Sequence, residues 1–233
     1  SLVGINYNTL NQENYLQPGS NLANILGYNQ KTDGGNRDYT TVWTNTADWK
    51  QTLSDKHNIN VLAGHEFTKN KFYSFSLAGR NLPSATYTTL DVAGSAQTAT
   101  TSRSDWSLES WFGQATYDYA KKYFVSLNGR RDGSSRFGAN KRWANFWSVG
   151  ASWDVLKEDF FKADFITALK LRGSIGTSGT VPSGLYDNLG VYSVAAKYQD
   201  QPAAIPLRLE NADLTWETNR NWDLGLYFSV LKN

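Results

Sequence analysis

The sequence predicts an all-β fold, an antiparallel up-and-down sheet of roughly eight strands of the kind found in membrane-type β-barrels. Three observations predict this fold. Aromatic residues are abundant (Trp 9, Tyr 13 and Phe 11) in a chain of 233 residues that is otherwise rich in Gly, Ser, Thr and Asn. Apolar and polar residues alternate along many segments, and short turns alternate with long polar loops. Aromatic and β-branched side chains favour a pleated sheet, and long runs of good helix formers are missing.

Each strand is predicted where apolar and polar residues alternate with a period of two. The segment Tyr123–Arg130 shows the pattern clearly, because Val125 and Leu127 alternate with the polar residues Ser126 and Asn128. The same pattern returns along the chain. In order, the predicted strands are Leu2–Tyr7, Thr40–Leu53, Asn58–Leu77, Gly113–Tyr119, Tyr123–Arg130, Trp147–Asp154, Leu169–Gly176 and Trp222–Ser229.

The connections between these strands also alternate. Short turns are predicted at Ser54–His57 and Ala120–Lys122, and long polar loops at Asn8–Asp38, Arg80–Arg103 and Thr180–Thr215. Short turns on one rim and long loops on the other are typical of an outer-membrane barrel. The connection Leu156–Ala168 is an exception, and within it the run Lys157–Phe161 predicts a short helical turn on the short-turn rim.

Alternation by itself does not separate a membrane barrel from a soluble β-sandwich. Two features favour the barrel. The apolar faces end in rings near the turns, as aromatic girdles do at a membrane surface, and the strands are long enough for a tilted membrane crossing. These rings are Tyr117, Tyr119, Tyr123, Trp153 and Trp222. The alternative is a soluble β-domain that binds carbohydrate or hydrolyses glycosides or esters.

Composition excludes several function classes. Lys+Arg 23 against Asp+Glu 21 gives a net charge of +2, without the cationic excess that grips nucleic acid. Cysteine is absent, so disulfides, thiolate metal sites and cysteine nucleophiles are excluded. No run approaches the about 20 apolar residues of a spanning helix, and Ser1–Leu10 lacks the basic start and apolar core of a signal peptide.

Catalytic and metal motifs are also missing from the sequence. His57 and His65 are too few and too separated for a convincing metal site. The Gly-x-Ser-x-Gly motif does not occur, and Asp33–Asp38 lacks the spacing of an EF-hand. Acidic residues occur in small groups of the kind that any β-protein offers: Asp105, Glu109, Glu158, Asp159, Glu210, Asp213 and Glu217. We expect no catalytic residue, no metal and no cofactor.

Particular runs carry a family resemblance. The run Arg131-Asp132-Gly133-Ser134-Ser135-Arg136-Phe137-Gly138, followed by Asn140–Trp143 and Phe146–Trp153, resembles the hairpin typical of SusC/RagA-type TonB-dependent outer-membrane transporters. Leu169–Gly179 and Asn211–Thr218 resemble the next strand and the lead-in to the one after it, in the same order and spacing. The family usually has Pro where Ala212 stands, which affects only the stiffness of that loop.

The resemblance implies a function larger than this chain. It implies the outer membrane of a Gram-negative, Bacteroidetes-like bacterium, and nutrient uptake of oligosaccharides or peptides, as in polysaccharide utilisation, through a plugged barrel of about 22 strands. The implied partners are a SusD-like surface lipoprotein as lid, the TonB complex and outer-membrane lipid. Residues 1–233 are expected to form part of the barrel domain, with no plug and no TonB box, neither an enzyme nor competent for transport alone.

Two sets of candidate site residues follow. The polar faces of the strands are expected to line the lumen, with Asp118, Ser126, Asn128, Arg130, Lys170, Arg172 and Asp223, while Val125, Leu127, Val149, Leu171, Leu224 and Leu226 face lipid. The long loops are expected outside the cell, where tyrosines can stack on a sugar or peptide or meet the lid. These are Tyr15, Tyr28, Tyr87, Tyr186, Tyr192 and Tyr198, and for any single one a plain solvated loop position is the alternative.

Overall fold

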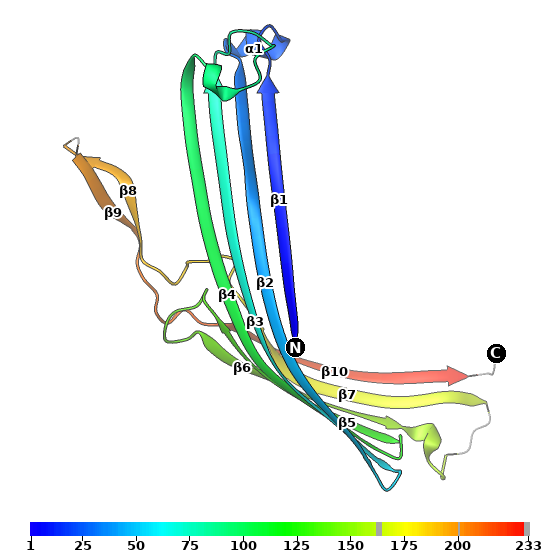
Figure 1. Cartoon of the computed structure of the whole chain (residues 1–233). Coiled ribbons are helices and arrows are strands. Elements are labelled where there is room, and N and C mark those ends of the chain that lie inside the picture. The colour runs from blue at the N-terminus through cyan, green and yellow to red at the C-terminus, as the bar shows by residue number, and fades with distance from the viewer. Residues whose placement is uncertain (162–164, 200, 231–233) are drawn as a thin grey trace. The chain divides into compact units, whose positions relative to one another are not determined.

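The computed structural model describes residues 1–161, 165–199 and 201–230, and most of them lie in β-strands. The predicted all-β fold is confirmed (Figure 1). In chain order the elements are β1 (Leu2–Leu16), α1 (Asn21–Leu26), β2 (Gln30–Leu53), β3 (His57–Arg80), the 3-10 turn η1 (Leu90–Val92), β4 (Ser95–Tyr119), β5 (Tyr123–Ser134), β6 (Trp143–Asp154), the 3-10 turn η2 (Val155–Lys157), β7 (Ile166–Thr180), β8 (Val191–Tyr198), β9 (Gln201–Arg208) and β10 (Glu217–Val230).

The main sheet has eight strands in the order β1-β2-β3-β4-β5-β6-β7-β10, and β8 and β9 form a separate hairpin. Neighbours in this order follow one another along the chain, except that the β8–β9 hairpin is inserted before β10. This is the up-and-down arrangement that the sequence predicted. The order is open, with β1 and β10 at its two ends. None of the helices in the described ranges is both long and apolar enough to cross a membrane.

The chain divides into two compact units, which are described separately. The first contains residues 1–2, 43–68 and 107–233, and the second contains residues 3–42 and 69–106. In the second unit, α1 lies at the same end of the strands as the β3–β4 connection (Figure 1). The Ser20 side chain accepts a hydrogen bond from Ala23 N (3.2 Å), and Gly27 ends the helix with φ 73°. This helix was not predicted, because six residues are too few for a periodic pattern.

The strands are longer than predicted at the loop ends. Most of the predicted loop Asn8–Asp38 is strand, and β4 begins well inside the predicted loop Arg80–Arg103. The predicted loop Thr180–Thr215 contains the β8–β9 hairpin. These three loop predictions were therefore wrong in extent. The reason is physical: backbone hydrogen bonds hold a strand whatever its side chains are, whereas the prediction required one apolar face.

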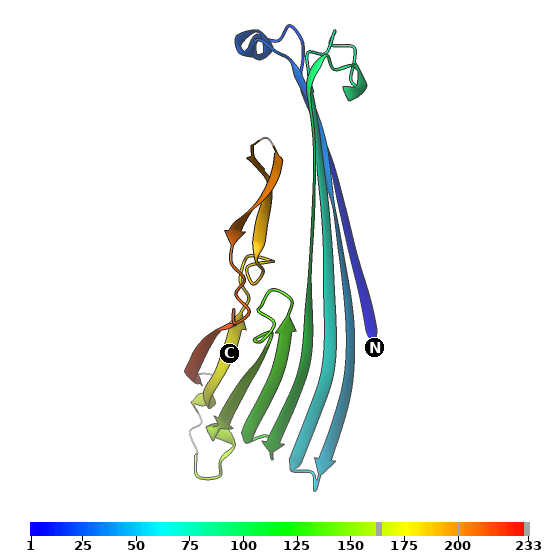
Figure 2. The same cartoon turned by 90° about the vertical axis from the view of Figure 1, so that its left-hand side faces the viewer.

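The short turns of the first unit lie at one end of its strands (Figures 1 and 2). Ser54 and Asp55 have φ 50° and 55°, and Ala120 and Lys121 have φ 52° and 54°. Positive φ at both central residues is the geometry of a two-residue hairpin turn. The second turn docks on the first, because Ala120 N donates to Lys56 O at 2.6 Å. Both predicted short turns are confirmed.

The predicted helical turn Lys157–Phe161 is confirmed in part. Phe161 N donates to Glu158 O at 3.1 Å, which closes a turn inside the predicted run, but the helical element itself is displaced. The structure has the 3-10 turn η2, which begins two residues earlier and shares only Lys157 with the prediction. Residues 162–164 of the predicted connection Leu156–Ala168 lie outside the described residues. The charged residues after Asp154 predicted a turn in this connection but not the residue at which it begins.

An apolar cluster of the first unit joins two of the segments that carry the family resemblance. Phe137, Phe146 and Trp216 are buried, and the ring centroid of Trp216 lies 4.4 Å from that of Phe137 and 5.5 Å from that of Phe146. The Trp216 Nε1 donates to Arg142 O at 2.9 Å, and Gly138 N donates to Leu214 O at 3.0 Å. The β5–β6 loop is thereby fixed to the segment that leads into β10.

Candidate functional site

The pairing registers place the predicted lumen residues on one face of the sheet. Directly opposite residues of antiparallel strands share a face. Asn128 is opposite Gln114 and Ser148, and in the same way Ser126 is opposite Gly150, which is opposite Ser174 and then Asp223. Following the register with the two-residue alternation of each strand, all seven candidates share this face: Asp118, Ser126, Asn128, Arg130, Lys170, Arg172 and Asp223. We call it the polar face.

The opposite face is apolar and is the more exposed of the two. Along β5, Val125 and Leu127 are exposed, whereas Ser126 and Asn128 between them are half-buried. On β10, Leu224 reaches 77% exposure. A water-soluble sandwich has the reverse arrangement, with apolar side chains covered. The exposed apolar residues on this face of β5, β6, β7 and β10 include Val125, Leu127, Trp147, Val149, Leu171, Ile175, Trp222, Leu224, Leu226 and Phe228. We call it the apolar face.

Charged side chains of the polar face neutralise one another. Arg130 Nε lies 2.6 Å from Asp132 Oδ1, and its guanidinium also donates to the buried Ser110 Oγ at 2.8 Å. Arg172 Nε lies 3.6 Å from Asp223 Oδ1, where both side chains are exposed. Because the Arg130 pair is partly buried and has an additional hydrogen bond, it orients that side chain more firmly than the exposed Arg172 pair does.

Asp118 is engaged in holding a turn. Its Oδ1 accepts hydrogen bonds from Lys121 N and from Asn58 Nδ2, both at 3.0 Å. This carboxylate therefore satisfies a backbone donor of the β4–β5 turn and links β4 to β3. Lys170 also has an internal contact, because its Nζ lies 4.6 Å from the centre of the Phe124 ring.

The Glu158 carboxylate, on the turn after β6, connects residues at the short-turn ends of neighbouring strands. Glu158 accepts a hydrogen bond from Trp153 Nε1 at 3.0 Å and lies 3.2 Å from Lys122 Nζ. Hydrogen bonding from Tyr123, then from Trp153 and Lys122, holds the pKa of Glu158 below its ordinary value. The charged form of Glu158 therefore ties the ends of β5 and β6 together.

The six candidate tyrosines fall into two groups, one in each unit. Tyr15, Tyr28 and Tyr87 belong to the second unit. The Tyr15 hydroxyl lies within donating distance of the carbonyl oxygens of Ser84 (3.2 Å) and Tyr87 (3.1 Å). Arg80 stacks over the Tyr28 ring, with its guanidinium carbon 4.1 Å from the ring centre. Tyr15 and Tyr28 therefore stabilise the loop end of this unit, while the Tyr87 side chain is exposed.

Tyr186, Tyr192 and Tyr198 belong to the first unit and are exposed. Tyr192 and Tyr198 are on β8, where they pair with Pro206 and Gln201 of β9. Two of the three rings therefore stand on a hairpin that is separate from the main sheet (Figure 1).

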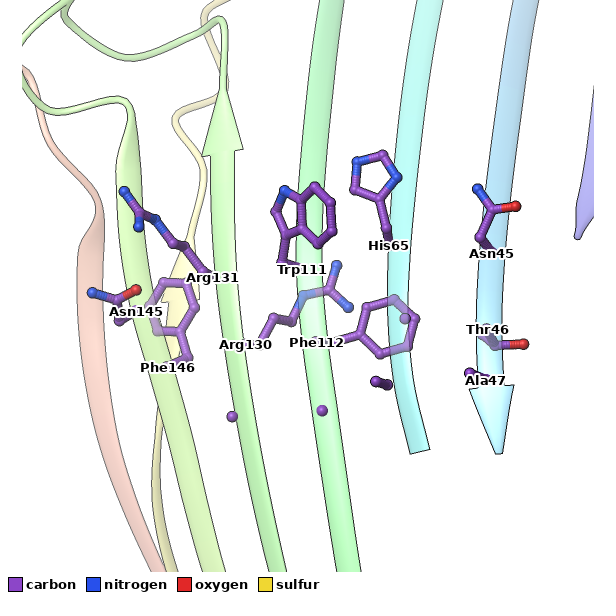
Figure 3. A pocket seen from close by; sticks show the side chains of 14 residues that line it. Asn45, Thr46, Ala47, His65, Trp111, Phe112, Arg130, Arg131, Asn145 and Phe146 are labelled. Carbon is purple, nitrogen blue, oxygen red and sulfur yellow. The ribbon is translucent and has the colours of Figure 1, made fainter. Parts of the chain in front are cut away.

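The structure also shows a hollow that the sequence prediction missed. It has a volume of about 690 Å³ and lies over β2 to β6 of the first unit. Figure 3 shows Arg131, Trp111, His65 and Asn45 following one another across neighbouring strands. In the next row Gly113 is opposite Gly129. Adjacent small residues of this kind become visible only when the register is known.

Few described side chains are arranged in a way that suits catalysis or metal binding. Within the described ranges, no three His, Asp or Glu side chains lie close enough together to hold a metal ion. His65 Nε2 lies 3.1 Å from Glu109 Oε1, and ring contacts with Trp111 (centroids 4.1 Å apart) and Trp43 (6.4 Å) flank this pair. Such a pair among aromatic rings is suited to the boundary between apolar and polar surroundings.

Comparison with known proteins agrees with this architecture. A family model described as TonB dependent receptor-like, beta-barrel matches residues 2–232. TonB-dependent receptor P39 of Formosa agariphila is 31% identical over 193 residues, covering 81% of this chain and 18% of the relative. TonB-dependent receptor SusC of Bacteroides thetaiotaomicron is 30% identical over 186 residues, covering 75% of this chain and 18% of the relative. The chain thus spans about a fifth of the length of these relatives.

Solved structures share the fold. The RagAB peptide transporter superposes with a TM-score of 0.91 at 23% identity, covering 98% of this chain and 26% of that one. The RagAB peptide importer in its "closed-closed" state gives a TM-score of 0.92 at 23% identity, covering 99% and 26%. The sheet is therefore similar to about a quarter of a much longer chain.

Proposed function

We propose a function on the premise that this chain belongs to the TonB-dependent receptor-like β-barrel family: it forms part of the barrel wall of an outer-membrane nutrient importer. The polar face lines a wet lumen and the apolar face meets lipid. One observation carries the proposal, namely that the register gathers the polar side chains on one face while the opposite face is apolar and exposed. Closed barrels in membranes have this two-faced wall.

The rows of rings support the placement of the bilayer. Tyr119, Tyr123 and Trp153 are consecutive neighbours at the short-turn end of the apolar face. Trp111 and Arg131 form a second row eight residues away on β4 and β5. Eight residues span about 26 Å along a strand, which is about 20 Å across the membrane at the tilt of about 35–45° that barrel strands have. The two rows are therefore spaced for the two edges of an apolar band of about 25 Å.

The loop end faces the outside and the short turns face the periplasm in this proposal. Short periplasmic turns and longer extracellular connections are the rule in such barrels. By likeness to SusC and to the RagAB peptide transporter, the cargo is an oligosaccharide or a peptide, a SusD-like surface lipoprotein covers the loops, and the TonB complex supplies energy through a plug. The chain is then a transport element and not an enzyme.

The β8–β9 hairpin is the segment on which to test this function. Deleting the whole predicted loop Thr180–Thr215 would also remove Asn188, whose Nδ2 donates to Phe137 O at 3.0 Å, and would disturb the buried cluster. A sharper change is to replace only residues 191–208 by a short Gly-Ser linker in the full-length receptor. The matched variant keeps the hairpin and changes Tyr192 and Tyr198 to Ala.

Both variants are expected to reach the outer membrane as folded barrels, while uptake or lid binding falls. Uptake of a labelled peptide or oligosaccharide mixture and co-purification of the lid lipoprotein measure this, and heat-modifiable gel mobility reports the fold. Normal uptake together with normal lid binding in the hairpin deletion would contradict the role given to these residues.

A further inference from the structure

We propose that the hollow shown in Figure 3 is a binding site for a phosphate-bearing lipid, with an acyl chain in the hollow and the phosphate at the row that contains Arg131. The proposal rests on the proposed function, because it requires the apolar face to meet a bilayer. It goes beyond general lipid contact in naming one site and the chemistry of its occupant.

The hollow lies on the apolar face. Gly129 and Arg131 alternate along β5 with Asn128 and Arg130, so they share the face of Leu127. Trp111 is opposite Arg131, and Gly113 is opposite Gly129. His65 is on the same face, because its ring lies 4.1 Å from that of Trp111. The side chains of the row between them, Phe112 and Arg130, point to the other face.

The floor is low because its residues are small. Ala63, Gly113 and Gly129 line it. A Cβ added to Gly129 would meet no atom within 4 Å, and one added to Gly113 would come no closer than 3.7 Å to the Leu62 carbonyl oxygen. These glycines are therefore not required by crowding. On the same face Trp111, Leu127 and Trp147 beside them are large, while Ala115 is small. The missing side chains of the two glycines therefore leave a shallow hollow that an apolar chain can fill.

The rim supplies donors for an anion at one edge of this hollow. The Arg131 guanidinium carbon lies 5.2 Å from the centre of the Trp143 ring, and within the described part of the chain no carboxylate lies within 4.0 Å of this cation. Asn145, opposite Arg131, adds an amide. A guanidinium forms paired hydrogen bonds with phosphate oxygens, and tryptophan rings are favoured at the level of lipid headgroups.

The apolar floor and the cationic rim together favour an amphiphile over a simple ion or an apolar molecule. The hollow is shallow and mostly apolar, so a free phosphate would use only the rim, and a lipid without a charged head would leave Arg131 without an anion. The acyl chain and the phosphate together match the two parts of the site. His65, whose Nε2 lies 3.1 Å from Glu109 Oε1, lines the hollow on the β3 side.

Native mass spectrometry of the full-length receptor in detergent tests this inference. The probes are dioleoyl phosphatidic acid, dioleoylglycerol, which lacks the phosphate, and glycerol 3-phosphate, which lacks the chains. Arg131→Gln removes the cation and Gly129→Leu fills the floor. The matched controls on the same face are Arg220→Gln on β10 and Ala151→Leu on β6, which lie outside the hollow.

We expect the receptor to retain phosphatidic acid at least about tenfold better than either partial probe, since a hydrogen bond to a charged group contributes that order of affinity. Arg131→Gln and Gly129→Leu should each lower retention about tenfold, and the controls should not. Equal retention of dioleoylglycerol or of glycerol 3-phosphate would overturn the assignment, as would equal loss in the controls.

Heat-modifiable mobility and membrane fractionation are measured on the same samples. They distinguish failure of the lipid-site inference from failure of the proposed function. A receptor that inserts normally but shows no difference between variants and controls refutes the lipid site alone. A receptor that does not insert through this face refutes the proposed function with it. Should Gly129→Leu fail to fold, the exposed Arg131→Gln still decides between these outcomes.

Discussion

A charge placed on the apolar face of β5 should lower the unfolding free energy much more than the same charge on the polar face. Leu127 is exposed on the apolar face, four residues from Tyr123 and four from Arg131. At about 3.3 Å per residue, it lies about 13 Å along the strand from each row of rings. It is therefore near the middle of the apolar band, where an arginine facing lipid costs about 2–4 kcal/mol. We expect Leu127→Arg to lower the unfolding free energy of the receptor by this amount.

The neighbouring residue provides the matched change. Asn128 is half-buried on the polar face, opposite Gln114, and its Nδ2 donates to Ser148 Oγ at 3.0 Å. Asn128→Arg loses this hydrogen bond, a net cost of about 0.5–1.5 kcal/mol, but the new charge lies in a hydrated lumen. The expected difference between the two variants is about 0.5–3.5 kcal/mol, from the same substitution one residue apart.

Equilibrium urea titration of the receptor folding into lipid vesicles measures both free energies. The control is Leu127→Ala, which removes the leucine without adding a charge. Equal losses for Leu127→Arg and Asn128→Arg, or a larger loss for Asn128→Arg, would refute the assignment of the faces.

Three further changes test particular contacts. Lys121→Gly should stabilise the receptor by about 1 kcal/mol, because Lys121 has φ 54° and glycine adopts positive φ without steric cost; a lower urea midpoint for this variant would refute that. Trp216→Ala should cost about 3–5 kcal/mol in the same titration, since its ring is buried between Phe137 and Phe146, and a loss below 1 kcal/mol would show that the cluster is not a core. The hydrogen bonds to Glu158 lower its folded pKa below the ordinary 4.5, so its contribution is complete above that pH and is lost as pH falls through the folded pKa. Glu158→Gln should remove this part of the acid sensitivity, which unfolding measured from pH 6 to pH 3 would reveal, and an unchanged pH profile would contradict it.

The sequence predicted the short-turn ends of the strands more closely than the loop ends. The predicted ends at Tyr119, Tyr123 and Asp154 coincide with the ends of β4, β5 and β6. At the loop ends every one of these strands continues beyond the prediction, by 18 residues in β4, from Gly113 back to Ser95. Apolar and polar residues alternate along a strand only where one of its faces is apolar. A strand that is polar on both faces shows no such pattern in the sequence.

The candidate site was predictable in part for the same reason. Period-two alternation was enough to group Ser126 with Asn128 and Arg130, and the register then joined them to Arg172 and Asp223 across three more strands. The hollow at Gly113 and Gly129 could not be predicted, because it depends on which residues of separate strands become neighbours. The internal contacts of Tyr15 and Tyr28 likewise depend on loops that return to the strand ends.

The measurement that tests the barrel wall most directly is cysteine labelling along β5. The chain contains no cysteine, so single substitutions at Val125, Ser126, Leu127 and Asn128 can be read without background from this segment. A small charged methanethiosulfonate reagent is applied to the receptor in intact outer membranes, and denatured samples give the total thiol. The proposed wall predicts rapid labelling at Ser126 and Asn128 and protection by lipid at Val125 and Leu127. Uniform labelling of all four, or protection at the polar positions with labelling at the apolar ones, would contradict it.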